Sequence, residues 1–194
     1  MLSNVNIKDA LREGLIRIDG LQESAIQPAS VDLHLAKEFI IPREHYEWGG
    51  WAQDPYKQED IDVAFGSVHN WDEFVLGSLE FALAATSEVV CLGNEIAAEV
   101  SGKSSLARLG LVVHVTAGFI DPGFEGPITL ELFNCSPNAI LLTPGMPIAQ
   151  LVFTRLDTPA SPGYAGKYVG ATGPQVSMYW KNERPQVIHK EGQV

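Results

Sequence analysis

The stretch LVVHVTAGFIDPGFEGPITLELFN, residues 111–134, decides the fold class. Its two apolar runs, 111–120 and 128–134, have strand length, and the Asp-Pro-Gly sequence between them is a turn signal. In the second run, three aliphatic residues alternate with Thr129, Glu131 and Phe133. That alternation has the period of a strand with two different faces. The stretch therefore predicts two strands joined by a turn, with a carboxylate on the face opposite the aliphatic residues.

The same pattern continues on both sides of this stretch. FVLGSLEFALAATSEVVCL (74–92) and AILLTPGMPIAQLVFTRL (139–156) each fit a strand or a strand pair, and SVDLHLAKEFII (30–41) alternates apolar and polar residues. Residues 6–18 favour a short helix capped by Asn6. Many short strands at this spacing predict a mainly β fold, an antiparallel sandwich or barrel with a short N-terminal helix.

The chain length predicts one domain over residues 1–194. Within it, residues 43–72 are acidic and aromatic without periodicity, and we interpret them as an irregular insertion; its notable aromatic residues are Trp48, Trp51, Tyr56 and Trp71. Residues 157–194 are rich in Gly, Pro and small side chains. We expect this C-terminal segment to be flexible and to order over a ligand.

Composition excludes several classes of protein. A formal net charge of -11 without any basic block argues against a nucleic-acid partner, because binding to the phosphate backbone requires a basic face. No run of 18 apolar residues and no secretory signal pattern are present, so we expect no membrane partner and a cytoplasmic location. Cys91 and Cys135 are too few for a structural zinc site.

GKSSLARLG (102–110) places two cations and two hydroxyls together without an acidic residue. Such a group suits a phosphate, although it lacks the spacing of a phosphate loop, and a solvated turn between strands is the simpler interpretation. Asp121 could contact a sugar hydroxyl or cap a turn, and Glu131 could be a base or a surface carboxylate. His114 fits a histidine within a strand better than a metal ligand, and no zinc deaminase signature is present.

Taken together, these stretches resemble the dCTP deaminase family, whose members are related to the trimeric dUTPases. The resemblance rests on SGKSSLARLGLVVHVTAGFIDPGFEGPITLELFN (101–134) and PGMPIAQLVF (144–153), and it extends to IQPASVDLHL (26–35) and EFVLGSLEF (73–81). A looser match covers GKYVGATGP (166–174). The resemblance therefore covers most of the chain and weakens within the insertion.

The resemblance implies roles for residues at the reacting base. Glu131 falls on the catalytic carboxylate, which acts first as a general base and then as a general acid without a metal ion. Ser104 and Arg108 fall on side chains that hold the attacking water and the reacting end of the base. Val115 and Ala117 fall where the backbone contacts the edge of the pyrimidine.

The resemblance also implies the rest of the nucleotide site. Lys103 and Ser105 fall on positions that contact phosphate, and Asp121 falls on the residue that contacts the sugar 3′-hydroxyl. Lys167 and Tyr168 belong to the closing C-terminal segment. The family implies a homotrimer with sites between subunits, and a triphosphate that binds together with Mg²⁺ and without zinc.

The product follows from a smaller motif. The sequence TAGFID, with Gly118 and Phe119, is similar to the bifunctional members that convert dCTP to dUMP, ammonia and diphosphate, whereas TAHRID is usual in members that stop at dUTP. The alternatives are a single-function deaminase, a dUTPase, and a nucleotide-binding regulator that has lost catalysis. The last is favoured only by Ala171, which stands where the family's closing segment commonly has a glutamine.

Overall fold

The computed structural model describes residues 1–43 and 52–184 of the chain. Three α-helices lie in these ranges, α1 (Asn4–Arg12), α2 (Gln58–Ala64) and α3 (Ser104–Ala107), with the short 3-10 helices η1 (Glu23–Ala25) and η2 (Tyr179–Lys181). The strands are β1 (Ile16–Asp19), β2 (Ile26–Gln27), β3 (Ser30–Ile40), β4 (His69–Asn70), β5 (Phe74–Leu76), β6 (Phe81–Leu92), β7 (Ile96–Gly102), β8 (Leu111–Val112), β9 (Phe119–Ile120), β10 (Glu125–Asn134), β11 (Ile140–Leu142) and β12 (Pro147–Arg155).

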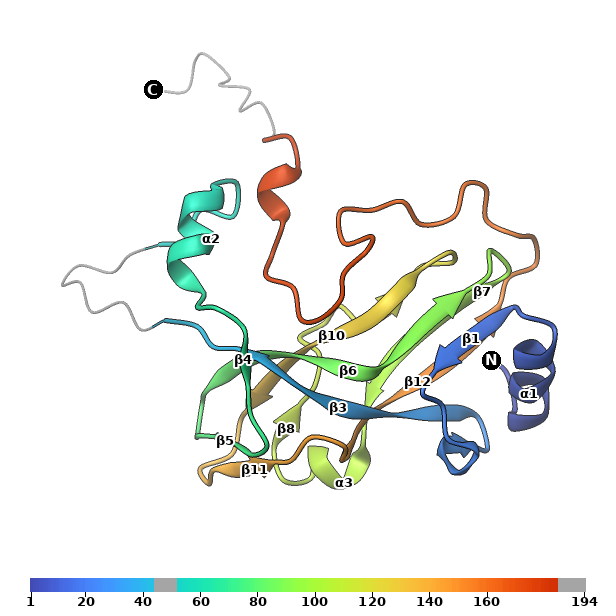
Figure 1. The fold of residues 1–194 in the computed structure, drawn as a ribbon, viewed down its shortest axis with the longest axis horizontal. Helices are drawn as coiled ribbons and strands as arrows, with labels where there is room; N and C mark the ends of the chain where they lie inside the picture. The colour runs from blue at the N-terminus through green and yellow to red at the C-terminus, as the bar shows by residue number, and fades with distance from the viewer. Residues whose placement is uncertain (44–51, 185–194) are drawn as a thin grey trace, which may run out of the picture.

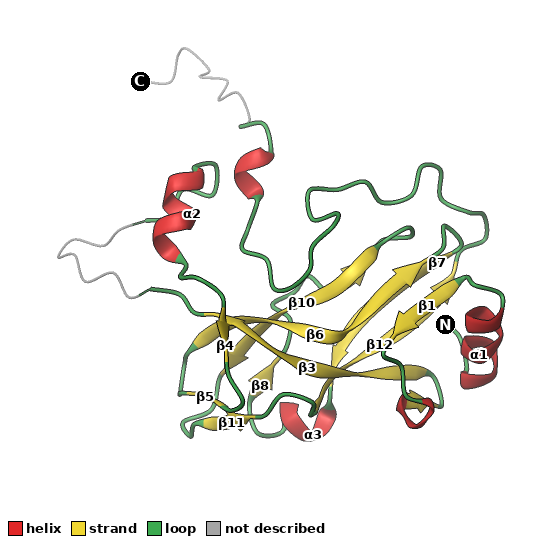
Figure 2. Cartoon of the chain, viewed as in Figure 1, coloured by secondary structure: helices red, strands yellow, loops and turns green. Residues whose placement is uncertain are grey.

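Ten of these strands form one curled antiparallel sheet. Its main path runs β8-β10-β6-β3-β12-β7-β9, with β1 paired to β6 and with β2 and β4 paired to β3, while β5 and β11 form a separate small sheet. The sheet wraps around itself like half a barrel, and α1 and α3 lie at different edges of it (Figures 1 and 2). The prediction of a mainly β, antiparallel fold with a short N-terminal helix is confirmed.

The alternation along the strands decides what faces the core. On β10, Ile128, Leu130 and Leu132 are buried, and they belong to a cluster that includes the fully buried Phe39 of β3 and Phe153 of β12. Their neighbours on the other face of β10 are only half-buried. Because a side chain of this size contributes about 1.5–3 kcal/mol when it is fully buried, the aliphatic stripe fixes which face of β10 turns away from the core.

The predicted helix over residues 6–18 was too long at its C-terminal end. Helix α1 begins after Ser3, whose hydroxyl accepts a hydrogen bond from the Asn6 backbone N–H, so Ser3 and not Asn6 is the N-cap. Gly14 adopts a left-handed conformation (φ +74°), which ends the helical turn. Ile16 and Ile18 then alternate with exposed neighbours in β1, because pairing with β6 buries their side chains.

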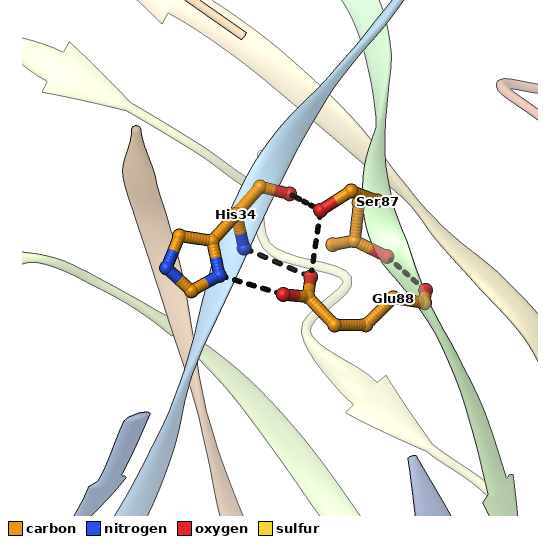
Figure 3. A network of polar contacts seen from close by, with 4 residues as sticks. His34, Ser87 and Glu88 are labelled. Carbon is orange, nitrogen blue, oxygen red and sulfur yellow. Dashed lines mark hydrogen bonds and ion pairs between the residues drawn. The ribbon is translucent and has the colours of Figure 1, made fainter. Parts of the chain in front are cut away.

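A polar network joins β3 to β6 next to the paired residues Leu35 and Thr86 (Figure 3). Glu88 is buried, and one carboxylate oxygen lies 2.6 Å from His34 Nδ1 while the other accepts from the His34 backbone N–H at 2.9 Å. The Ser87 hydroxyl adds a third contact to the same carboxylate at 3.2 Å. A buried carboxylate is tolerated only with such partners, so this network fixes the two strands relative to each other.

The insertion and the C-terminal segment lie side by side in the structure. Within residues 43–72, Trp48 and Trp51 fall outside the described residues, whereas α2 and β4 are regular elements and Trp71 stacks on Phe74 at 5.2 Å. Residues 157–184 run along the open edge of the sheet to η2, which lies beside α2 (Figure 1). Among the described residues, no helix is both long enough and apolar enough to span a bilayer.

Candidate active site

A pocket of about 850 Å³ opens on the polar face of β10. Aromatic side chains dominate its walls and come from the insertion, the sheet and the C-terminal segment; they are Phe65, Phe81, Phe119, Phe124, Phe133, Tyr164 and Tyr168. Its polar groups include Asp121, Thr129, Glu131, Gln175 and Ser177. A concave apolar space with a few convergent polar groups is the usual form of a small-molecule site.

Glu131 projects from the middle of β10 into this pocket. Thr129 and Phe133, which share its face, line the pocket as well, so the predicted face of the strand is confirmed. One carboxylate oxygen of Glu131 accepts a hydrogen bond from the Val115 backbone N–H at 2.7 Å. The other oxygen has no hydrogen-bond partner within the described residues. Glu131 is therefore half-buried beside aromatic rings. Its carboxylate accepts one hydrogen bond, and its second oxygen can accept another from a ligand.

The loop between β8 and β9 forms the wall next to Glu131. It contributes Val115 and Ala117 to the lining, and Thr116 between them is left-handed (φ 72°). Gly118 closes the loop, since its carbonyl accepts from Val100 N–H at 2.7 Å and a Cβ placed on it would lie 2.8 Å from the Val100 carbonyl oxygen. Glycine is thus required by close contact with the β7 backbone.

Two side chains near this loop are available for a ligand. Asp121 lines the pocket and is exposed, and its turn is closed by a backbone hydrogen bond from Phe124 N–H to Asp121 O at 3.2 Å. Its carboxylate is therefore not needed to cap the turn. His114 also lines the pocket, and its buried Nδ1 has no hydrogen-bond partner in the described part of the chain.

The residues around α3 form a second group. Lys103 precedes the helix, and its ammonium lies 2.6 Å from the Asp32 carboxylate of β3, which is buried. Ser104, Ser105 and Arg108 are exposed. None of these four basic and hydroxyl residues lines the pocket with Glu131, and no ion pair joins Arg108 to Glu131 within the described ranges. Within the described part of one chain, the α3 residues and the Glu131 pocket are therefore two separate groups.

The C-terminal segment covers one side of the pocket. Tyr168 lines it, and its hydroxyl accepts from Met178 N–H at 3.1 Å. Gln175 also lines it, and its backbone N–H donates to the Thr129 hydroxyl at 3.2 Å. Lys167 instead lies above the Tyr179 ring at 5.7 Å. The structure thus places Tyr168 at the pocket and turns Lys167 toward the segment's own residues.

Four residues near these groups were not predicted from the sequence. Phe65, Tyr164 and Gln175 line the pocket, and Asp32 pairs with Lys103. Asp32 could have been predicted, because it lies on the polar face of the strand expected over residues 30–41 and within IQPASVDLHL (26–35), which resembles the family. The other three come from segments without periodicity, and nothing in their local sequence marks them.

No group of three or more His, Cys, Asp or Glu side chains gathers into a metal site within residues 1–43 and 52–184. Within the described residues, the carboxylate that pairs with the α3 group is that of Asp32, which lies 2.6 Å from the Lys103 ammonium. This donor set suits a magnesium ion held mainly by phosphate oxygens, because Mg²⁺ commonly uses one or two carboxylates together with substrate phosphates.

Comparison with known proteins identifies the family of the chain. A family model described as dCTP deaminase-like matches residues 1–156. A "dCTP deaminase, dUMP-forming" of Tropheryma whipplei (strain Twist) is 44% identical over 184 residues, covering 92% of this chain and 92% of that protein. A relative with the same name from Salinispora tropica is 40% identical over 189 residues, covering 95% and 97%.

Among solved structures, the 2′-deoxycytidine 5′-triphosphate deaminase of Agrobacterium tumefaciens superimposes with a TM-score of 0.61 at 21% identity. The match covers 80% of this chain and 48% of that one. At this identity, the superposition establishes a shared fold.

Proposed function

The chain belongs to the dCTP deaminase-like family, and from that membership we propose that it converts dCTP to dUMP, ammonia and diphosphate in the pocket around Glu131. The observation that carries the proposal is the Glu131 carboxylate, which projects among aromatic rings with one oxygen bonded to Val115 N–H and one without a partner in the described residues. The motif TAGFID, which predicts the dUMP-forming reaction, agrees with the names of the relatives.

Deamination needs a group that accepts and returns protons. Water adds to C4 of cytosine while Glu131 takes its proton and passes it to N3 of the ring. Glu131 then takes the remaining hydroxyl proton and gives it to the amino group, the C4–N bond breaks, and ammonia leaves behind a C4 carbonyl. The hydrogen bond from Val115 N–H orients the carboxylate for both steps. The aromatic walls keep bulk water away from the reacting atoms.

The remaining pocket groups suit the nucleoside. The backbone at Val115 and Ala117 lies beside Glu131 and reads the edge of the pyrimidine, whereas the free carboxylate of Asp121 accepts from the sugar 3′-hydroxyl. Tyr168 covers the bound nucleoside from the C-terminal segment. These assignments follow the family resemblance, and their support is that one pocket collects all four residues.

The α3 group reaches the nucleotide from a neighbouring subunit in a homotrimer. Support comes from its position, since Ser104 and Arg108 are exposed and lie apart from the Glu131 pocket of their own chain. Lys103 and Ser105 bind the phosphates, and Ser104 and Arg108 hold the attacking water and the base. Mg²⁺ bound with the triphosphate would neutralise phosphate charge, and Asp32, which pairs with Lys103, would be the carboxylate on hand to bind it.

Mixing two inactive variants tests the shared site. When chains carrying Glu131→Gln are mixed with chains carrying Arg108→Ala, each trimer that contains both kinds of chain has one site in which both residues are native. A random 1:1 mixture therefore recovers about a quarter of the native sites. Subunits are exchanged by joint refolding, and ammonia release is measured. If mixed trimers form but ammonia release does not recover, the site is not built from two subunits.

The second reaction is hydrolysis of the triphosphate. Water attacks the α-phosphorus of the deaminated nucleotide, the bond from that phosphorus to the bridging oxygen breaks, and diphosphate leaves. Gly118 keeps the loop flat against the Val100 carbonyl, where a larger residue would push the loop into the space of the incoming water.

Product analysis tests the whole proposal. The protein is incubated with dCTP and Mg²⁺, and nucleotides, ammonia and diphosphate are quantified together. We expect equal amounts of dUMP, ammonia and diphosphate. Accumulation of dUTP indicates a single-function deaminase, turnover of dUTP without ammonia from dCTP indicates a dUTPase, and binding without turnover indicates a regulator; each of these outcomes contradicts the proposal.

A further inference from the structure

The insertion makes a specific contact with the end of the C-terminal segment. Arg184 forms an ion pair with Asp54, and its guanidinium lies 5.1 Å from the centre of the Tyr56 ring. The rings of Tyr56 and Tyr179 meet edge to face with centroids 5.1 Å apart. Figure 1 shows the same arrangement at the level of elements, with η2 beside α2. We call these four residues, Asp54, Tyr56, Tyr179 and Arg184, the latch.

The insertion side of the latch is organised by its own backbone. One carboxylate oxygen of Asp54 accepts from Tyr56 N–H at 3.0 Å, and Asp54 N–H donates to the Asp60 carboxylate of α2 at 2.8 Å. The hydrogen bond from Tyr56 N–H, followed by the Arg184 side chain, lowers the pKa of Asp54. Asp54 is therefore a fixed anion to which the arginine can bind.

Between the latch and the sheet, one amide of the C-terminal segment bonds to the sheet and a second bonds within the segment. Gln175 N–H donates to the Thr129 hydroxyl at 3.2 Å, and Thr129 lies on the same face of β10 as Glu131. Met178 N–H donates to the Tyr168 hydroxyl at 3.1 Å. Tyr168 and Gln175 both line the pocket. The latch thus follows directly after the residues that form this wall.

Besides Gln175, Tyr164 ties this wall to the rest of the fold, since its backbone N–H donates to the Pro122 carbonyl at 2.7 Å. The segment from 164 to 178 has no helix or strand, so conformational entropy opposes its order and each anchoring contact changes its population. The insertion also reaches the pocket itself, because Phe65 follows α2 and lines the pocket. One structural unit therefore supplies a wall residue and the anchor for the opposite wall.

We propose that Asp54 and Tyr56 are positioning residues of the active site, which act through Arg184 and Tyr179 to hold the C-terminal segment over the bound nucleotide. This assigns a role to Asp54 and Tyr56, which belong to the insertion but are not among the residues that line the pocket with Glu131. The effect on the bound nucleotide rests on the proposed function. Docking of the C-terminal segment onto the insertion rests on the contacts alone.

Amide hydrogen exchange measures docking without turnover. The full chain is compared with Asp54→Asn, Arg184→Gln, their combination, and Tyr56→Ala. Loss of a part-exposed ion pair should speed exchange of the Gln175 and Met178 amides about threefold, and loss of the Tyr56 ring contacts about tenfold. Because Arg184→Gln removes both the ion pair with Asp54 and the contact with the Tyr56 ring, the combined variant should match Arg184→Gln.

Two further variants separate a latch from general damage. Asp62→Asn removes an exposed charge from α2 that has no ion pair in the described residues, and it should leave exchange unchanged. Arg184→Lys keeps the charge over Tyr56 and should restore slow exchange. The latch is overturned if the amides exchange as fast in Asp54→Asn as in Asp62→Asn. It is also overturned if exchange in Arg184→Lys is not slow.

Steady-state kinetics tests the positioning role. Weaker docking should raise KM for dCTP by the same factor as the amide exchange rate. It should leave kcat within about twofold, because saturating nucleotide binds the docked segment and restores its population. Faster exchange with unchanged KM overturns the positioning role. If the native protein does not turn over dCTP at all, the proposed function fails, while the exchange experiment still decides whether the latch exists.

Discussion

Replacing Glu131 by glutamine should separate catalysis from binding and folding. The substitution keeps the side-chain size, and the new amide oxygen can still accept from Val115 N–H, where the carboxylate now accepts at 2.7 Å. Exchanging a charge-assisted hydrogen bond for a neutral one in a half-buried position costs about 1 kcal/mol of stability. The variant should therefore remain folded, with its aliphatic stripe and sheet pairing intact.

The expected kinetic effect is much larger. The amide cannot take the proton of the attacking water, and general acid–base catalysis is worth about 10²–10⁴ in rate. The barrier to deamination should rise by roughly 3–5 kcal/mol. Affinity for dCTP should change far less, because the proposed function assigns the phosphate and sugar contacts to Lys103, Ser105 and Asp121.

The assay measures ammonia release and dCTP affinity on the same folded sample. Glu99→Gln is the matched control, because Glu99 is an exposed carboxylate in the middle of β7. It should keep native turnover. Native turnover in Glu131→Gln would refute the reasoning and would make Glu131 the solvated surface carboxylate that its sequence context also allows.

Three further results are expected. Glu88→Gln should lower the free energy of unfolding in urea by about 2–3 kcal/mol, because a neutral amide replaces a buried carboxylate that contacts the His34 backbone N–H, the His34 ring and the Ser87 hydroxyl; a loss no larger than that of Glu99→Gln contradicts this role. Gly118→Ala should slow diphosphate release about tenfold and let dUTP accumulate, because its Cβ would lie 2.8 Å from the Val100 carbonyl; an unchanged product ratio removes Gly118 from the second reaction. Exhaustive chelation followed by return of Mg²⁺ alone should restore full activity, whereas stoichiometric zinc whose removal abolishes turnover would overturn metal-free deamination.

The local pattern of β10 could be predicted because a strand has a period of two. Once ITLELFN is a strand, Ile128, Leu130 and Leu132 must share one face and Glu131 must lie on the other, and burial of the aliphatic residues sets which face is inside. The family and the product class also follow from local motifs. The uninterrupted stretch 101–134 carries both the resemblance to the family and the TAGFID motif.

The end of α1 shows where local pattern becomes ambiguous. Ile16 and Ile18 are two positions apart, which is the spacing of a strand, but two apolar residues are too few to separate a short strand from the end of a helix. Pairing with β6, which lies more than 70 residues away, decided for the strand. The same limit explains the cap, because Ser3 and Asn6 are both good capping residues and only the path of the chain selects one.

Only the tertiary structure decided how the site is assembled. Folding separates the α3 group from Glu131 although fewer than thirty residues lie between them, and it brings Phe65 to the pocket from the insertion. The contact of Asp54 with Arg184 spans 130 positions of sequence. No periodicity records such contacts, because they depend on how the curled sheet places distant loops at one edge. Sequence thus determined which chemical groups are present and which strand face carries them, whereas packing between remote segments decided which of them meet.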